Sequence, residues 1–339
     1  MRIHVQSLAG DPAFQLTEQR WHAACARAGA IGAGAIGAGA IGAGHSVTFG
    51  ADADALAAGL LEAEALVTQT SALAQALPVL PPAPRLRLIY CTAAGLDSLA
   101  PFTWLPAGVQ LLNNRGTHGH KAGEYGLMAL LMLANRMPAY ATAQRASVWA
   151  GATHGTMLAG QRLLVVGLGT LGGAIAERAA AAGMIVTGVR TTATPHPACT
   201  RVVDLAGLDA ALAEADMLVL AVPLTTVTRD LLDRRRLALL PAHAGVVNIG
   251  RGALLDQDAL CDALDAGTLG GAILDVFTPE PVPAGHRLWT TRNLIMTPHM
   301  SADDPATYVP LSLDIFFSNL AALTEGRPLP NLFKVARGY

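Results

Sequence analysis

Three side chains that could bind an anion and transfer a proton follow apolar runs in the second half of the chain. Arg251 follows GVVNIG, Glu280 lies in LDVFTPEP, and His299 lies in TPHMS. The arginine fork keeps its proton, so it can bind a carboxylate and polarise a neighbouring ketone. A protonated histidine can donate to a developing alkoxide, and a carboxylate beside it favours the imidazolium. The set is suited to reducing a carbonyl beside a carboxylate.

Each of these residues also has an ordinary structural interpretation. Arg251 could be a surface ion-pair partner, Glu280 a solvated loop residue beside prolines, and His299 a residue at a helix N-terminus. Their common position after strands of one predicted domain favours a site, because the carboxyl ends of strands line the ligand crevice in doubly wound sheets.

A glycine-rich motif, GLGTLG, occupies residues 167–172. It directly follows the apolar run LLVVG and precedes the helix-forming run AIAERAAAAG. In such a strand–turn–helix context Gly167 permits a tight turn, Gly169 lets the backbone approach a pyrophosphate, and Gly172 allows the helix to pack closely on the strand. The motif therefore predicts dinucleotide binding; the plainer alternative is a tight turn with no ligand.

The pentad AIGAG occurs three times in tandem within residues 30–44 and contains two further matches to G-x-G-x-x-G. A phosphate-binding loop must follow a strand and open a helix. These copies instead follow a predicted helix over residues 14–28 that ends in Ala-Gly. We interpret the repeat as a lengthened surface connection without chemistry.

The elements that must position these residues form two series of short apolar runs separated by helix-length segments. Repeated strand–helix–strand order predicts parallel sheets covered by helices on both faces. The sequence thus predicts an α/β protein of two doubly wound domains, a Rossmann cofactor domain (116–302) inserted in a flavodoxin-like substrate domain (1–115 and 303–339). The predicted strands are 3–8, 46–49, 65–69, 86–91 and 109–112 in the first series, and 163–167, 184–189, 217–222, 245–250 and 271–276 in the second.

Composition argues against several other classes of protein. Lys and Arg number 23 against 25 Asp and Glu, with no basic block, so nucleic acid is not expected as a partner. Mean hydropathy is +0.39, but the longest dense apolar run, 126–134, is far shorter than the ~20 residues of a membrane span. Four scattered cysteines and an N-terminus without an apolar signal core predict a cytoplasmic protein with reduced thiols. His118 and His120 lack a third ligand nearby, so no metal site is expected.

Eight motifs in a fixed order resemble the D-isomer-specific 2-hydroxyacid dehydrogenase family across nearly the whole chain. They are YCTAAGLDSL, GEYGLMALLMLA, GLGTLG, AVPLTTVTRDLL, NIGRGALLD, GGAILDVFTPEP, RLWTTRNLIMTPH and GRPLPN. The resemblance implies reversible, NAD(P)H-dependent reduction of a 2-keto acid to a D-2-hydroxy acid. In this scheme His299 is the acid and base, Glu280 assists it, and Arg251 binds and polarises the substrate.

The resemblance also implies contacts for individual residues. Backbone N–H groups of Ala94 and Gly95 bind the substrate carboxylate together with Arg251 and His299, and Asp275 holds the nicotinamide carboxamide. The remaining implied cofactor contacts are Gly167, Gly169, Thr170, Leu171, Gly172, Val222, Pro223, Thr228, Ile249, Gly250, Arg251 and His299.

The choice between NADP and NAD depends on the end of the second predicted Rossmann strand. An acidic residue there normally binds the ribose hydroxyls and selects NAD. In this sequence the position holds Arg190, followed by Thr191 and Thr192, with no acidic residue before Asp204. An arginine can pair with a 2′-phosphate. We therefore expect NADP(H) to be preferred; if Arg190 were merely exposed, NAD(H) use would stay open.

Two rival functions share the predicted fold. A nucleotide-sensing binding protein would need no proton donor, and a formate- or phosphite-type dehydrogenase would reduce the cofactor with a small anion. The family resemblance further implies a homodimer, for which the helix around 125–137 and the arm around Trp149 are the candidate surface. The alternative for that helix is an ordinary place in the core.

Overall fold

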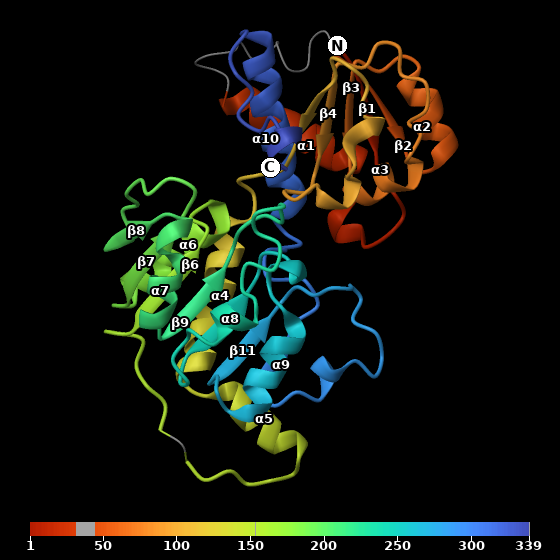
Figure 1. Ribbon diagram of the computed structural model, residues 1–339. Coiled ribbons are helices and arrows are strands. Elements are labelled where there is room, and N and C mark those ends of the chain that lie inside the picture. Colours follow the sequence, from red (N-terminus) through yellow and green to blue (C-terminus); the bar gives the residue numbers. More distant parts are fainter. Residues whose placement is uncertain (32–44, 153, 339) are drawn as a thin grey trace. The chain divides into compact units, whose positions relative to one another are not determined.

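The computed structural model describes residues 1–31, 45–152 and 154–338. The chain forms two compact units (Figure 1): the first unit comprises Met1–Thr117 and Asp304–Tyr339, and the second unit His118–Asp303. These divisions lie within two residues of the boundaries expected from the sequence. Each unit contains one parallel sheet, so the predicted α/β class with two parallel-sheet domains is confirmed.

The first unit is built on a five-stranded parallel sheet in the order β2-β1-β3-β4-β5. Its strands are β1 (Arg2–Gln6), β2 (Ser46–Gly50), β3 (Ala65–Thr68), β4 (Leu88–Cys91) and β5 (Gln110–Leu112), and its helices are α1 (Glu18–Ile31), α2 (Ala53–Leu60), α3 (Thr70–Ala76) and α10 (Tyr308–Thr324). The C-terminal helix α10 lies beside α1 (Figure 1), and Trp21 of α1 packs against the rings of Phe316 and Phe317. The C-terminal segment therefore completes the core of the N-terminal sheet.

Helix α1 differs from the predicted helix at both ends. It begins at Glu18 instead of residue 14, because Pro12–Phe14 form a separate 3-10 turn capped by Asp11. It also continues through Gly29 to Ile31, so Ala28-Gly29 does not end it. Residues 32–44, which hold most of the AIGAG repeat, lie outside the described residues, and their interpretation as a surface connection stays a prediction.

The second unit is built on a seven-stranded parallel sheet in the order β12-β11-β10-β9-β6-β7-β8. Its strands are β6 (Arg162–Val166), β7 (Ile185–Val189), β8 (Arg201–Val203), β9 (Met217–Leu220), β10 (Gly245–Asn248), β11 (Gly271–Leu274) and β12 (Leu294–Met296). The sequence predicted five of them and missed the two edge strands, β8 and β12. Each missed strand has only three residues, and most of these are only partly buried.

Helices cover both faces of the second sheet. They are α4 (Gly119–Ala134), α5 (Met137–Arg145), α6 (Thr170–Ala181), α7 (Leu208–Glu214), α8 (Arg234–Leu237) and α9 (Gln257–Ala266). Helices α4 and α6 pack closely because α4 carries Gly126 at the contact, where a Cβ would lie 2.5 Å from Ile175 Cγ1. This contact fixes α6, whose first turn belongs to the glycine-rich motif.

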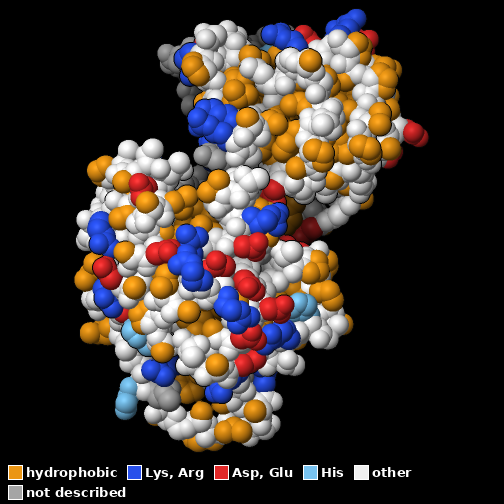
Figure 2. Space-filling model, in the orientation of Figure 1, with side chains coloured by type: hydrophobic (Ala, Val, Ile, Leu, Met, Phe, Trp, Pro, Cys, Tyr) orange, Lys and Arg blue, Asp and Glu red, His pale blue; other side chains and the backbone are white. Residues whose placement is uncertain are grey.

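Part of the charged surface of the second unit consists of ion pairs. Figure 2 shows Lys and Arg side chains interspersed with Asp and Glu over the second unit. Asp209 pairs with Arg235 and Arg236, and Asp262 pairs with Arg234 and Arg287. Exposed pairs of this kind add little stability, but they neutralise the arginines locally. Among the described residues, no helix is both long and apolar enough to cross a membrane.

Candidate active site

The glycine-rich motif forms the turn between β6 and α6. Gly167 has a φ of +97°, and a Cβ there would lie 2.6 Å from the carbonyl oxygen of Ala221. A Cβ on Gly172 would overlap the carbonyl oxygen of Gly167, whereas Gly169 faces open space. Gly169 is the N-cap of α6 and provides no side-chain acceptor for the first N–H groups of the helix. These groups and the helix dipole suit a phosphate, so the turn fits a dinucleotide.

Loops beside this turn bring the other predicted cofactor residues close to it. Val222 follows β9, and its Cγ1 would lie 2.7 Å from a Cβ on Gly167. A Cβ on Gly250, after β10, would lie 2.8 Å from the carbonyl oxygen of Val222, while Ile249 is buried. Thr228 Oγ1 donates to the carbonyl of Pro223 at 2.7 Å and so holds the 223–228 loop. The motif, the 222–228 loop and the end of β10 are therefore neighbours.

His299 and Glu280 form a direct hydrogen bond. His299 Nδ1 lies 2.8 Å from Glu280 Oε2, and the other carboxylate oxygen, Oε1, accepts from the backbone N–H of Phe277 at 2.6 Å. Because Nδ1 donates to the carboxylate, Nε2 is the ring nitrogen left to face a reactant. The His299 side chain is 49% exposed, which leaves it accessible.

The backbone of His299 adopts a left-handed conformation that non-glycine residues rarely take. Its φ is +52°. Asp275, fully buried at the end of β11, holds the surrounding segment: its carboxylate accepts from the N–H groups of Met300 at 2.9 Å and Ser301 at 2.8 Å and from the hydroxyl of Thr297 at 2.5 Å. The backbone N–H of His299 also donates to the carbonyl of Asp275 at 2.9 Å. Asp275 therefore positions His299.

Two residues of this arrangement were not found by sequence reasoning. Thr297 also hydrogen bonds to Tyr125 of α4 at 2.7 Å, and burial raises the pKa of Tyr125 to about 12. A chain of contacts thus runs from α4 through Thr297 to Asp275. The only available sequence signal was the position of Thr297 two residues before His299, and it does not reveal the partners.

Arg251 stands next to the Glu280 loop. It follows β10 and is the N-cap of the 3-10 turn Gly252–Leu254, with Nη1 donating to the carbonyl of Gly250 at 2.8 Å. A Cβ on Gly252 would overlap the backbone of Phe277, the residue whose N–H holds Glu280. Strands β10, β11 and β12 are consecutive in the sheet. The structure thus brings Arg251, Glu280 and His299 to one edge of the second unit.

Arg190 directly follows β7, and its backbone N–H donates to the carbonyl of Val203 at 3.1 Å. Thr191 and Thr192 after it are exposed. The next acidic residue, Asp204, caps the turn Leu205–Gly207 by accepting from the N–H groups of Ala206 and Gly207. Its carboxylate is therefore engaged, and the end of β7 presents Arg190 and hydroxyl groups.

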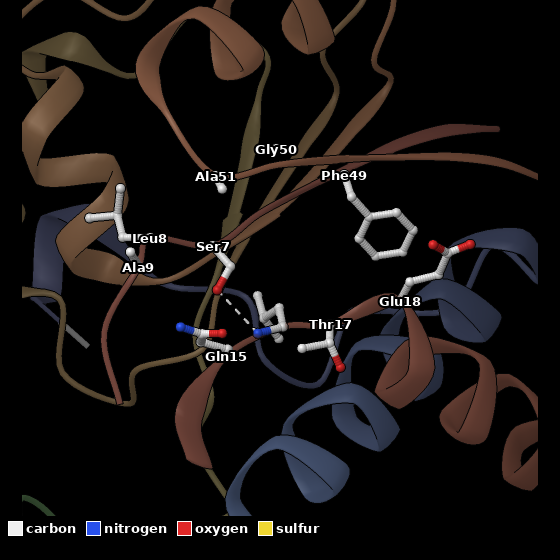
Figure 3. A pocket seen from close by; sticks show the side chains of 10 residues that line it. Ser7, Leu8, Ala9, Gln15, Thr17, Glu18, Phe49, Gly50 and Ala51 are labelled. Atoms are coloured by element: carbon white, nitrogen blue, oxygen red, sulfur yellow. Dashed lines mark hydrogen bonds between the residues drawn. The ribbon is translucent and has the colours of Figure 1, made fainter. Parts of the chain in front are cut away.

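The predicted substrate residues Ala94 and Gly95 belong to the first unit. They follow β4, and the carbonyl of Ala94 accepts from Asn113 Nδ2 at 2.8 Å. A separate pocket of about 350 Å³ in this unit (Figure 3) lies after β1 and β2 and does not include them. Its Ser7 hydroxyl already accepts from the N–H of Leu16, and Glu18 adds a carboxylate. The pocket is therefore ill suited to an anionic acid.

His118 is buried at the N-cap of α4. Its Nδ1 lies 3.0 Å from the carbonyl oxygen of Ala302, and burial lowers its pKa, which favours the neutral ring. Within residues 1–31, 45–152 and 154–338, no group of three His, Cys, Asp or Glu side chains could hold a metal ion.

The sequence of the second unit matches a known family. The family model described as "D-isomer specific 2-hydroxyacid dehydrogenase, NAD binding domain" matches residues 127–301, about half of the chain. The chain belongs to this family. The predicted family is therefore confirmed, and with it the class of NAD(P)-dependent 2-hydroxyacid dehydrogenases, whose members are oxidoreductases that use a nicotinamide cofactor.

Individual relatives agree with this assignment. A D-3-phosphoglycerate dehydrogenase of Mycobacterium tuberculosis is 32% identical over 290 residues, which cover 85% of this chain and 54% of the relative. The chain thus spans about half the length of this curated relative. A D-isomer specific 2-hydroxyacid dehydrogenase of Xanthobacter autotrophicus, in complex with NADPH, is 28% identical with a TM-score of 0.79 and 99% of both chains covered. An NADPH-dependent glyoxylate/hydroxypyruvate reductase of Sinorhizobium meliloti, in complex with NADP, is 26% identical with a TM-score of 0.77 and 100% of both chains covered.

Proposed function

We propose that this family member reduces a 2-keto acid to a D-2-hydroxy acid with NADPH. The observation that carries the proposal is the arrangement of Arg251 and the Glu280–His299 pair at the ends of neighbouring strands, in the same unit as the glycine-rich turn. The two NADP-bound relatives support the same cofactor class.

In the proposed mechanism each residue has one task. NADPH, when bound, supplies the hydride. The guanidinium of Arg251 binds the carboxylate of the keto acid and draws electron density from the ketone. The part of Ala94 and Gly95 in carboxylate binding stays a prediction from the family resemblance. His299 gives the proton on Nε2 to the developing alkoxide, and Glu280 stabilises the imidazolium from Nδ1. In the reverse direction the same nitrogen accepts the proton.

A panel of substrates tests this proposal against its two rivals. We expect the protein to oxidise NADPH with at least one of pyruvate, glyoxylate, hydroxypyruvate and phenylpyruvate. The absorbance of the reduced cofactor measures the reaction, and each acid is tested with NADPH and with NADH. Inertness across a broad keto-acid panel would favour a nucleotide sensor. Cofactor reduction by formate or phosphite would favour the third function. A proton donor held by a carboxylate argues for the reductase, because a sensor does not need one.

Cofactor preference is the next part of the proposal and yields a first prediction. We infer that Arg190, with Thr191 and Thr192, selects NADPH by pairing with its 2′-phosphate, since no free carboxylate occupies that position. Arg190→Asp removes the attraction and adds repulsion. Because hydrogen bonds to charged groups contribute about 1.5–3 kcal/mol, the NADPH/NADH ratio of kcat/KM should fall at least about 10-fold.

The control for this prediction is Arg201→Asp. Arg201 is a half-exposed arginine at the start of β8, where it pairs with Glu214. The Arg201→Asp substitution should leave the NADPH/NADH ratio of kcat/KM unchanged. Equal or better efficiency of the wild type with NADH would overturn the proposed preference.

A homodimer is the proposed assembly. Helix α4 buries Tyr125, Ala129 and Leu130 in the core of its unit but leaves Leu131 47% exposed, and Trp149 in the following arm is 97% exposed. Met128, Met137 and Val148 in the same segment are exposed as well, and a contiguous apolar patch formed by such side chains would mark an interaction surface. The helix thus combines a core face with an outward apolar face. The cytoplasmic location expected from the sequence also stays a prediction.

Light scattering provides the test of the dimer. At micromolar concentration we expect twice the chain mass of 34.9 kDa, and Leu131→Glu should shift the particle toward the single-chain mass. Val79→Glu, at an exposed apolar residue of the first unit, is the control and should stay dimeric. A wild-type particle of 34.9 kDa would refute the dimer.

A further inference from the structure

The loop between β7 and β8 returns to the first turn of α6 and places an imidazole there. His196 lies over Gly173, where a Cβ would be 3.3 Å from Nε2 and 4.0 Å from Cε1 of the ring. Gly173 comes directly after the last glycine of the motif and belongs to α6. A side chain at this position would crowd the imidazole, so the glycine provides the space that His196 occupies.

The ring of His196 is held in one tautomer. Its Nδ1 accepts the backbone N–H of Ala198 at 3.3 Å, and its carbonyl accepts the N–H of Cys199 at 3.0 Å. Because an accepting Nδ1 carries no proton, the neutral ring has its proton on Nε2. Pro195 and Pro197 on either side restrict the backbone and stiffen the loop. In the part of the chain that the structure describes, Nε2 makes no hydrogen bond to the protein.

His196 lies near the two elements between which this fold binds adenosine. In dinucleotide-binding domains the pyrophosphate lies at the helix N-terminus, and the ribose lies between that helix and the end of the second strand. These two elements are α6 and β7 here. Arg190 stands at the end of β7, and His196, six residues later, contacts α6. Arg190 thus lies at the end of one of these two elements, and His196 contacts the other.

We propose that His196 donates its Nε2–H to the 2′-phosphate of NADPH and is a second determinant of cofactor choice beside Arg190. The proposal rests on the proposed use of NADPH. A ligand without the 2′-phosphate lacks the acceptor, so the contribution of His196 should appear with NADPH and not with NADH. The role is one of binding and specificity, separate from the proton transfer assigned to His299.

Equilibrium binding tests the proposal without turnover. The dissociation constants of NADPH, NADH, 2′,5′-ADP and 5′-AMP are measured by calorimetry for the wild type, His196→Ala and His196→Gln. We expect His196→Ala to weaken NADPH and 2′,5′-ADP about 10-fold, as for a lost hydrogen bond to a charged group, and to change NADH and 5′-AMP less than twofold. His196→Gln retains an N–H donor and should recover part of the loss.

A matched control comes from His286, whose Nδ1 accepts the N–H of Leu288 at the same 3.3 Å in a different loop. His286→Ala should leave all four constants unchanged. If His196→Ala weakens the ligands with and without the 2′-phosphate equally, or weakens none, the proposal is wrong. If the wild type binds NADH as tightly as NADPH, the proposed NADPH preference itself fails; if Arg190→Asp abolishes the preference and His196→Ala does not, only the role of His196 fails.

Discussion

His299→Asn is expected to lower kcat for keto-acid reduction by about 10²–10⁴-fold and to leave the dissociation constant of NADPH within twofold. General acid catalysis typically contributes a factor of this size. Removing the ring removes the proton on Nε2 but none of the backbone groups around the glycine-rich turn, which belongs to α6 and β6. The loss should therefore fall on turnover, measured by stopped-flow absorbance, while fluorescence titration measures cofactor binding.

Asparagine is chosen because of the backbone at this position. His299 has a φ of +52°, a conformation that asparagine adopts more readily than alanine does. His299→Ala should show the same loss of turnover with a lower melting temperature. Retention of more than half of the wild-type rate by the asparagine variant would remove His299 from the mechanism.

The carboxylate of Glu280 provides a graded comparison. Glu280→Gln has a single amide oxygen, so it can keep the bond from the N–H of Phe277 but places an NH2 donor where Oε2 accepts from Nδ1 of His299. The neutral amide no longer stabilises the imidazolium. We expect kcat, measured by stopped-flow absorbance, to fall, but less than in the His299 variants, because the proton on the ring is kept.

The sequence predicted the features that repeat or follow a local pattern. Continuous apolar runs marked ten of the twelve strands, and the context of GLGTLG located the turn between β6 and α6. The edge strands β8 and β12 were missed because they are short and mostly only partly buried, so neither stood out as a continuous apolar run bounded by turn signals. The start of α1 was misplaced because capping of Pro12–Phe14 by Asp11 depends on local hydrogen bonds that apolar spacing does not record.

The hydrogen bonds that hold the candidate site in place were harder to predict from the sequence. The cofactor contact that the resemblance implied for Asp275 stays a prediction. What the sequence did not indicate is that this carboxylate accepts from Thr297, Met300 and Ser301, more than twenty residues away. The left-handed backbone of His299 depends on the same contacts. Hydrogen bonds over such separations follow from strand order in the sheet, which neither periodicity nor motif spacing encodes.

Arg251→Lys is expected to lower kcat/KM for the keto acid by about 10²-fold, chiefly through a higher KM, with no change in NADPH binding. The guanidinium uses Nη1 to bond the carbonyl of Gly250 at 2.8 Å, which orients its plane. A lysine ammonium keeps the charge but cannot hold that carbonyl and a bidentate carboxylate in one plane. Two charge-assisted hydrogen bonds at about 1.5–3 kcal/mol each account for a loss of this size even if part is recovered by the ammonium.

Chemical rescue separates recognition by Arg251 from a structural role. Arg251→Ala should lose still more activity and regain part of it when guanidinium ion is added, because the ion can occupy the vacated position; methylammonium should rescue less. Arg234→Lys, which alters an exposed ion pair with Asp262, is the control and should behave as the wild type. Two results would mean that Arg251 maintains the loop between β10 and Phe277 and does not bind the substrate. One is an unchanged apparent affinity of Arg251→Lys for the keto acid. The other is a loss of activity in Arg251→Ala that neither ion reverses, together with a loss of NADPH binding.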